Sequence, residues 1–265
     1  MTADLADRYD AFLFDLDGVL YRGSDPIPGA AEAVDRLRGL GKRVAFVTNN
    51  SSRTPDAVVE ALNAVGVRAH TGEVETSALA TADVLLARGV ADAFVVGEEG
   101  LRQALTGVGI ALAAADAELS ESVVVGFDRQ ADYAKLRTAS LLVERGAWLV
   151  ATNADPSYPA PDGRWPGAGA LLAVIETTTG VRAEVVGKPH PPILRSALAR
   201  AGGGRPLLIG DRLETDIAGA AALGWDSLLV LTGITLRDDL VGSPIAPTFV
   251  GADLSALFDA RPDER

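Results

Sequence analysis

Short apolar runs alternate with amphipathic stretches along the whole chain, and this alternation restricts the folds open to it. Runs typical of buried strands cover residues 11–14, 44–47, 206–209 and 227–231. Between the first two runs, apolar residues recur at the three- and four-residue spacing of a helix. Strands that alternate with helices are typical of a parallel sheet with crossover helices, so an α/β fold is expected.

The middle of the chain has a strand set of its own, at 94–96, 110–112, 123–125 and 148–150. Helical patterns lie at roughly 54–65, 75–88, 132–145, 168–179, 190–201 and 213–223. No low-complexity linker separates the middle from the rest of the chain. A second α/β unit inserted within the first explains this arrangement.

Composition excludes several classes of protein. The chain has 265 residues and a formal net charge of −12, which disfavours nucleic acid and anionic membranes as partners because both attract basic patches. It contains no cysteine, so neither disulfides nor thiolate metal sites can form. It shows no apolar signal core and no apolar run of the roughly 18 residues that span a bilayer. A soluble cytoplasmic protein is therefore expected.

Two carboxylates follow the first apolar run, Asp15 and Asp17, in the pattern Asp-x-Asp-Gly. Aspartate and glycine are ordinary turn residues, so this pattern alone is compatible with a plain turn. A calcium loop is excluded because Pro26 stands at the twelfth position, where such a loop needs glutamate. Ligands of open α/β sheets bind at the carboxyl ends of strands, which makes the pair a candidate active site.

Three further strand ends carry polar residues. Thr48 and Asn49 follow the run at 44–47, and Lys188 follows a short run at 185–186. Asp211 and Asp216 follow the run at 206–209. Each signal is weak by itself, but together they place carboxylates, hydrogen-bond donors and one cation at the same edge of a parallel sheet.

This order of motifs resembles the haloacid dehalogenase (HAD) superfamily, most of whose members are magnesium-dependent phosphatases. The segments Asp17–Gly23, Thr48–Ser51, Val186–Pro189 and Gly210–Ile217 resemble its 4-nitrophenylphosphatase, or NagD-like, branch. The resemblance covers nearly the whole chain. It implies a Rossmann-like parallel-sheet core with an inserted, smaller α/β cap domain.

The resemblance also implies roles for the acidic residues. Asp15 would be the nucleophile that forms an aspartyl-phosphate, and Asp17 would protonate the leaving group and then activate water. Mg²⁺ would be held by the Asp15 carboxylate, the Asp17 backbone carbonyl and Asp211. Asp216 would orient Lys188 or a metal-bound water.

The remaining core residues would bind the phosphoryl group. Thr48 and Asn49 would donate hydrogen bonds to its oxygens, and Lys188 would supply a positive charge. The types of these residues suit the roles that the resemblance gives them.

The stretch between Thr48 and Lys188 is long enough for a compact inserted domain of about 100 residues, an ordinary size for a small domain. We expect the catalytic core at 1–80 and 184–265 and the cap at 81–183. In the cap, Asp128, Arg129 and Asn153 are candidate contacts to the substrate. The resemblance suggests a homodimer that forms through the caps.

The expected function is hydrolysis of a small phosphorylated metabolite, such as glycerol 3-phosphate or 2-phosphoglycolate, or of 4-nitrophenyl phosphate. A phosphomutase would share the aspartyl-phosphate but protect it from water. A module that binds metabolites without turnover would keep the sheet, although Asp17 argues against it because a stable phospho-switch gains nothing from a hydrolytic base. A dehalogenase is disfavoured because it does not need a proton donor at Asp17.

Overall fold

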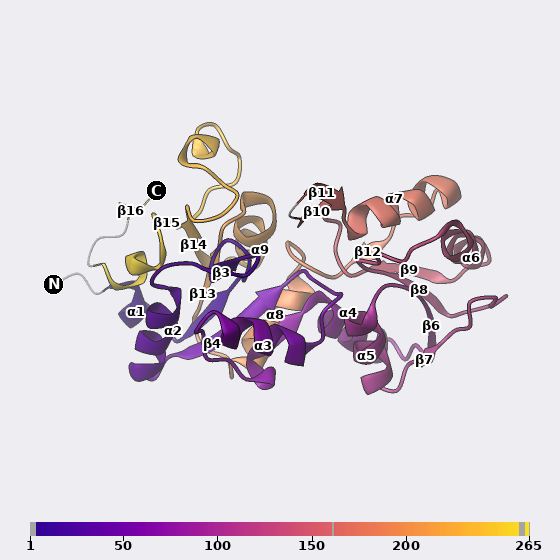
Figure 1. The fold of residues 1–265 in the computed structure, drawn as a ribbon, viewed down its shortest axis with the longest axis horizontal. Coiled ribbons are helices and arrows are strands. Elements are labelled where there is room, and N and C mark those ends of the chain that lie inside the picture. The colour runs from indigo at the N-terminus through magenta and orange to yellow at the C-terminus, as the bar shows by residue number, and fades with distance from the viewer. Residues whose placement is uncertain (1–3, 161, 260–262, 265) are drawn as a thin grey trace. The chain divides into compact units, whose positions relative to one another are not determined.

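The chain forms two compact units in a computed structural model that describes residues 4–160, 162–259 and 263–264. The first unit comprises Met1–Thr48, Pro55–Glu75 and Lys188–Arg265, and the second comprises Asn49–Thr54 and Thr76–Gly187. In Figure 1 the first unit takes its colours from both ends of the scale and the second from its middle. The second unit is thus inserted in the sequence of the first.

Among the described residues, the first unit contains a seven-stranded sheet in the order β16-β15-β14-β13-β1-β4-β5. Its strands are β1 (Ala11–Phe14), β4 (Arg43–Thr48), β5 (Val74–Thr76), β13 (Pro206–Gly210), β14 (Asp226–Val230), β15 (Phe249–Gly251) and β16 (Asp263–Glu264). Strands β4, β1, β13, β14 and β15 pair in parallel, whereas β16 pairs antiparallel with β15. All four residues of β1 are fully buried, as expected of a central strand in a sheet covered on both faces.

Helices and short turns complete the first unit. They are α1 (Leu5–Arg8), α2 (Ala30–Gly39), α3 (Pro55–Ala64), α8 (Pro191–Arg200), α9 (Ala218–Leu223), the 3-10 turns η1 (Thr71–Glu73), η3 (Arg237–Leu240) and η4 (Leu254–Phe258), the π-helical turn η2 (Leu213–Ile217), and a hairpin of β2 (Tyr21–Arg22) and β3 (Asp25–Pro26). In α2, Ala30, Val34 and Leu37 are buried, which confirms the helical spacing seen in the sequence. No helix in the described ranges is both long enough and apolar enough to cross a membrane.

The second unit has a sheet of its own, in the order β12-β9-β8-β6-β7. Its elements are α4 (Ser77–Ala87), β6 (Asp92–Val96), α5 (Glu99–Gly107), β7 (Ala111–Leu112), β8 (Ser122–Val125), α6 (Tyr133–Glu144), β9 (Trp148–Ala151), the hairpin strands β10 (Ser157–Ala160) and β11 (Gly163–Pro166), α7 (Ala168–Thr179) and β12 (Glu184–Val185). The pairs of this sheet are all parallel. The two parallel sheets confirm the α/β class and the expected core with a smaller inserted α/β unit.

The register of the first sheet brings the expected site together. Phe14 at the end of β1 lies opposite Ile209 of β13 and Phe46 of β4. The residues that follow these positions therefore emerge at one edge of the sheet. This edge carries Asp15, Thr48 and Asp211.

Candidate active site

Asp15 and Asp17 begin the loop that follows β1. The Asp15 amide donates to the Ile209 carbonyl at 2.9 Å, which extends the ladder between β1 and β13 by one residue. The Asp15 side chain is therefore held at the end of a rigid element, whereas Asp17 is exposed. One carboxylate is fixed and partly buried, and the other is open to solvent.

Lys188 joins two carboxylates from different parts of the chain. Its Nζ donates to Asp15 Oδ1 at 2.6 Å, to Asp216 Oδ1 at 2.7 Å and to the Val47 carbonyl at 3.3 Å. The Lys188 side chain is only 3% exposed. An ammonium group has three donors, and here each has an acceptor, so both the position and the charge of this lysine are fixed.

Asp216 lies in the π-helical turn η2 and is fully buried. Its Oδ2 accepts from the Arg212 amide at 3.2 Å, and its Oδ1 accepts from Lys188. A Cβ at Gly210 would come within 2.2 Å of the Asp216 Cβ, so the glycine that ends β13 makes room for this side chain. The sequence predicted a helix from residue 213, and in the structure the first turn of this helix is π-helical. Such π-helical turns are frequent at functional sites.

Asp211 follows β13 and is 1% exposed. Its Oδ2 accepts from the Ile234 amide at 2.7 Å. Its Oδ1 is buried and has no hydrogen-bond partner among the described residues. An unpaired buried carboxylate oxygen is costly, because desolvation of a charged group is not compensated.

The pKa values of these groups are shifted because the groups are buried close to one another. Burial raises the pKa of Asp15 well above its usual range; the Lys188 ammonium opposes this, and the Asp216 and Asp211 carboxylates add to it. Burial, followed by the Asp216 carboxylate, raises the pKa of Asp211 to about 6. Burial alone would lower the pKa of Lys188, but the Asp15 and Asp216 carboxylates outweigh it and raise the pKa above its ordinary value.

These residues fit a divalent cation. Asp15, Asp211 and Asp216 each offer a carboxylate oxygen, and the three oxygens lie within 4.8 Å of one another. Lys188 faces this cluster of three carboxylates, so negative charge remains in excess, and no donor in the described part of the chain reaches the buried Asp211 Oδ1. Oxygen donors with this charge suit hard cations such as Mg²⁺.

Thr48 and Asn49 fall into different units. Thr48 ends β4 in the first sheet and is 7% exposed. Asn49 groups with the second unit, where its side-chain amide donates to Asp155 Oδ2 at 3.2 Å. Its carbonyl accepts from Ser77 Oγ at 2.6 Å and from Asn153 Nδ2 at 2.7 Å. From its first residue, Asn49, the turn after β4 is therefore held by hydrogen bonds to the second unit.

Each substrate-contact candidate of the second unit has a partner within that unit. Asp128 is 6% exposed and pairs with Lys135 at 2.7 Å. The Arg129 side chain forms two hydrogen bonds to Glu98, both at 2.8 Å, and its backbone amide forms a third at 2.9 Å; these bonds lower the pKa of that carboxyl. Asn153 is 4% exposed and holds the Asn49 carbonyl. Their contact with a substrate stays a prediction.

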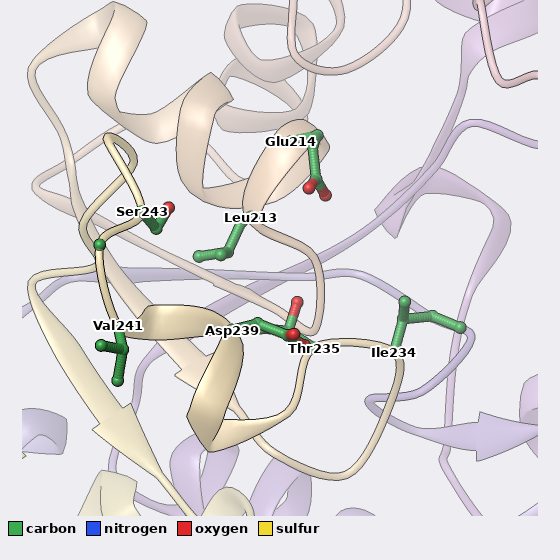
Figure 2. A pocket seen from close by; sticks show the side chains of 8 residues that line it. Leu213, Glu214, Ile234, Thr235, Asp239, Val241 and Ser243 are labelled. Carbon is green, nitrogen blue, oxygen red and sulfur yellow. The ribbon is translucent and has the colours of Figure 1, made fainter.

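A segment that sequence reasoning did not single out also contacts the site. Thr232–Thr235 follows β14 and bonds to Asp211 through the Ile234 and Thr235 amides. The signal that marks the other strand ends, polar residues with glycine after an apolar run, is present here as well. Beside this segment lies a cavity of about 500 Å³, with Leu213 and Glu214 on one side and Thr235 and Asp239 on the other (Figure 2).

Comparisons with known proteins agree with this geometry. Residues 12–111 match the family model of haloacid dehalogenase-like hydrolases, and residues 185–257 match a second HAD-hydrolase-like model. The chain is 38% identical over 254 residues to an acid sugar phosphatase of Staphylococcus saprophyticus, covering 95% of this chain and 97% of that protein.

Solved structures of phosphatases are similar to this chain as well. A glycerol phosphate phosphatase from Mycobacterium tuberculosis in complex with magnesium superposes with a TM-score of 0.91 at 36% identity, covering 98% of this chain and 80% of that one. A 4-nitrophenylphosphatase from Thermotoga maritima superposes with a TM-score of 0.89 at 32% identity, covering 96% and 97%. The chain belongs to the haloacid dehalogenase superfamily, as a phosphoric monoester hydrolase of its 4-nitrophenylphosphatase, or NagD-like, branch.

Proposed function

We propose that this phosphatase hydrolyses small phosphate monoesters through an aspartyl-phosphate on Asp15, with Mg²⁺ as its cation. One observation carries the proposal: Lys188 is held between Asp15 and Asp216, and the nearby Asp211 carboxylate has an oxygen with no donor among the residues that the structure describes. Such a cluster binds a phosphoryl group and a cation at the same place. A group fixed at a strand end is also suited to in-line attack, because its position costs no further entropy.

The reaction would take two displacements. A carboxylate oxygen of Asp15 attacks phosphorus, the bond from phosphorus to the ester oxygen breaks, and Asp17 gives its proton to the departing oxygen. Water then attacks phosphorus and gives a proton to Asp17. The bond from phosphorus to Asp15 breaks, and inorganic phosphate leaves. Proton transfer of this kind typically contributes about 10²- to 10⁴-fold to the rate.

The other residues would bind and orient. Lys188 would hold Asp15 in position and place its positive charge beside the phosphoryl oxygens, while Asp216 fixes the lysine. Thr48 and Asn49 would donate to the same oxygens. Asp15, Asp211 and the Asp17 backbone carbonyl would hold Mg²⁺, which when bound keeps Asp15 ionised and screens its repulsion from a phosphate dianion.

We propose that the second unit is the cap domain of this branch and sets substrate choice, with Asp128, Arg129 and Asn153 as candidate contacts. The names of the related phosphatases support glycerol phosphates, sugar phosphates and 4-nitrophenyl phosphate as the classes of substrate to test. The core and cap boundaries drawn from the sequence, the homodimer through the cap and the cytoplasmic location stay predictions.

A phosphate-release screen over a panel of monoesters, with and without Mg²⁺, tests the proposal. We expect wild type to release phosphate only with the cation and Asp15→Asn to fall to the rate without enzyme. Asp116→Asn, the same change at an exposed position, is the matched control and should match wild type. Full activity of Asp15→Asn would show that Asp15 is not the nucleophile.

Asp17→Asn tests the second displacement. With 4-nitrophenyl phosphate, whose leaving group departs without a proton, we expect a rate about 10²- to 10⁴-fold lower, with phosphate bound covalently to the acid-quenched protein in its mass spectrum. Steady transfer of the phosphoryl group to a second hydroxyl of the substrate, without release, would indicate a phosphomutase instead.

A further inference from the structure

The segment Thr232–Thr235, between β14 and η3, holds Asp211 at two points. The Ile234 amide donates to Asp211 Oδ2 at 2.7 Å, and the Thr235 amide donates to the Asp211 carbonyl at 3.1 Å. Both the side chain and the backbone of Asp211 are therefore fixed by one stretch of loop.

The same segment also holds the loop that carries Asp17. Thr232 Oγ1 donates to the Gly18 carbonyl at 2.6 Å, and Arg22 Nε donates to the Thr232 carbonyl at 2.8 Å. Gly18 is the residue directly after Asp17. One segment thus joins the end of β13 to the loop after β1.

Two glycines leave room for the Asp211 carboxylate. A Cβ on Gly233 would lie 1.9 Å from Asp211 Oδ2, and one on Gly18 would lie 2.4 Å from the same atom. Gly233 does not have the positive φ that favours glycine, whereas Gly18 does, at 82°. Space for Asp211 is therefore the reason for glycine at position 233.

These contacts distinguish the two oxygens of Asp211. Oδ2 is engaged by the Ile234 amide, and Oδ1 is buried without a hydrogen-bond partner among the described residues. We propose that Thr232–Thr235 is a positioning segment that orients Asp211 Oδ1 toward the divalent cation. The segment also holds the loop that carries Asp17 in a fixed position relative to Asp211. The proposal rests on the function proposed above, because that function supplies the cation.

On its other side the segment faces a cavity. Ile234 and Thr235 line the cavity of about 500 Å³ together with Leu213 and Val241 (Figure 2). The Val241 side of the cavity is open to solvent, since that residue is 80% exposed. Within the segment Ile234 is 60% exposed, whereas Thr235 is only 4% exposed.

Gly233→Ala tests the segment directly. We expect Mg²⁺ to bind about 10- to 100-fold more weakly, as is typical when a group that orients a metal ligand is lost. Isothermal titration calorimetry measures this without substrate. Gly39→Ala is the matched control, because a Cβ at that helical position meets nothing within 4 Å, and its Mg²⁺ affinity should equal that of wild type.

Thr232→Val provides a second test that keeps the shape of the side chain and removes its hydroxyl. At saturating Mg²⁺ we expect kcat to fall about 10- to 100-fold with KM little changed, since a small displacement of a catalytic group has effects of this size. Thr232→Ser keeps the hydroxyl and should restore kcat. This variant decides the matter if Gly233→Ala does not fold.

The proposal fails if Gly233→Ala folds and binds Mg²⁺ as wild type does, or if Thr232→Val keeps the kcat of wild type. Asp211→Ala separates this failure from failure of the proposed function. If Asp211→Ala loses Mg²⁺ binding while both segment variants behave as wild type, the cation site stands and the positioning segment is wrong. If Asp211→Ala also binds Mg²⁺ normally, the cation site itself is misplaced.

Discussion

At the scale of single residues, Lys188 balances the charges of the site. Its ammonium is buried between Asp15 and Asp216, and removing one partner of such a buried pair typically costs about 3 to 5 kcal/mol. Among the described residues Asp211 has no hydrogen-bond partner for its Oδ1, and burial, followed by the Asp216 carboxylate, raises its pKa. The positive charge of Lys188 therefore compensates the Asp15 carboxylate, whereas the charge of the Asp211 carboxylate is less well compensated.

Asp211 makes the stability of the metal-free protein depend on pH. Its pKa is about 6 in the folded protein against an ordinary 3.8, so the folded state binds the proton more tightly than the unfolded state. The contribution is full below the ordinary value and is lost as pH rises through about 6. With EDTA present, we expect the unfolding free energy of wild type to fall by about 1 to 3 kcal/mol relative to Asp211→Asn over this range.

Denaturant unfolding at a series of pH values measures this difference. Asp211→Asn is a suitable reference because its amide oxygen can still accept from the Ile234 amide while the charge is gone. Parallel pH profiles for the two proteins would show that Asp211 does not titrate differently in the folded state.

At the scale of elements, the turn after β4 connects two sheets. Thr48 belongs to the first sheet, and the following segment Asn49–Thr54 is fastened to the second unit. Ser51 is fully buried there, and its Oγ accepts from the Phe127 amide at 3.2 Å and from Thr152 Oγ1 at 3.1 Å. The two expected phosphate-binding residues, Thr48 and Asn49, thus take their positions from different units.

Ser51→Ala should loosen this segment. The Phe127 amide would lose its partner, and an unsatisfied buried donor costs about 1 to 3 kcal/mol. We expect faster hydrogen-deuterium exchange in residues 49–54 and at Phe127, with exchange in β1 and β13 unchanged. Ser52→Ala is the control, since the Ser52 hydroxyl donates to Asn50 within the segment. Equal exchange in the two variants would contradict the role given to Ser51.

At the scale of the whole molecule, the cluster of carboxylates found among the described residues that could hold a cation lies in the first unit. Asp15, Asp211 and Asp216 come from the ends of β1 and β13 and from η2. A ligand that binds only the folded form stabilises it by mass action. A cation at this site therefore stabilises the first unit directly.

Mg²⁺ should accordingly slow hydrogen-deuterium exchange at residues 15–18, 211–216 and 232–235. We expect exchange in the sheet of the second unit, β6 to β9, to change little. Ca²⁺ is a useful comparison, because the related glycerol phosphate phosphatase has been crystallised with either ion. Protection that is equally strong in the second sheet would show that the cation acts on both units.

Sequence patterns predicted the regular parts of the fold well. The strand expected at 11–14 is β1, and the helix expected at 168–179 is α7, because long or strongly apolar segments carry clear periodicity. Helix α5 (Glu99–Gly107) and the β10–β11 hairpin were not predicted. α5 is short, with charged residues among its apolar ones, and each strand of the hairpin contains a proline, which weakens a strand pattern.

The sequence by itself determined the α/β class, the insertion, the family resemblance and the residues expected to act, since these depend on local pattern and motif order. Only the tertiary structure decided how Lys188 is shared between Asp15 and Asp216, and which Asp211 oxygen no donor of the described ranges reaches. It alone showed that Gly233 makes room for that carboxylate. The reason is physical: burial, hydrogen bonding and charge arise between residues far apart in the chain, and no local pattern records which atoms meet.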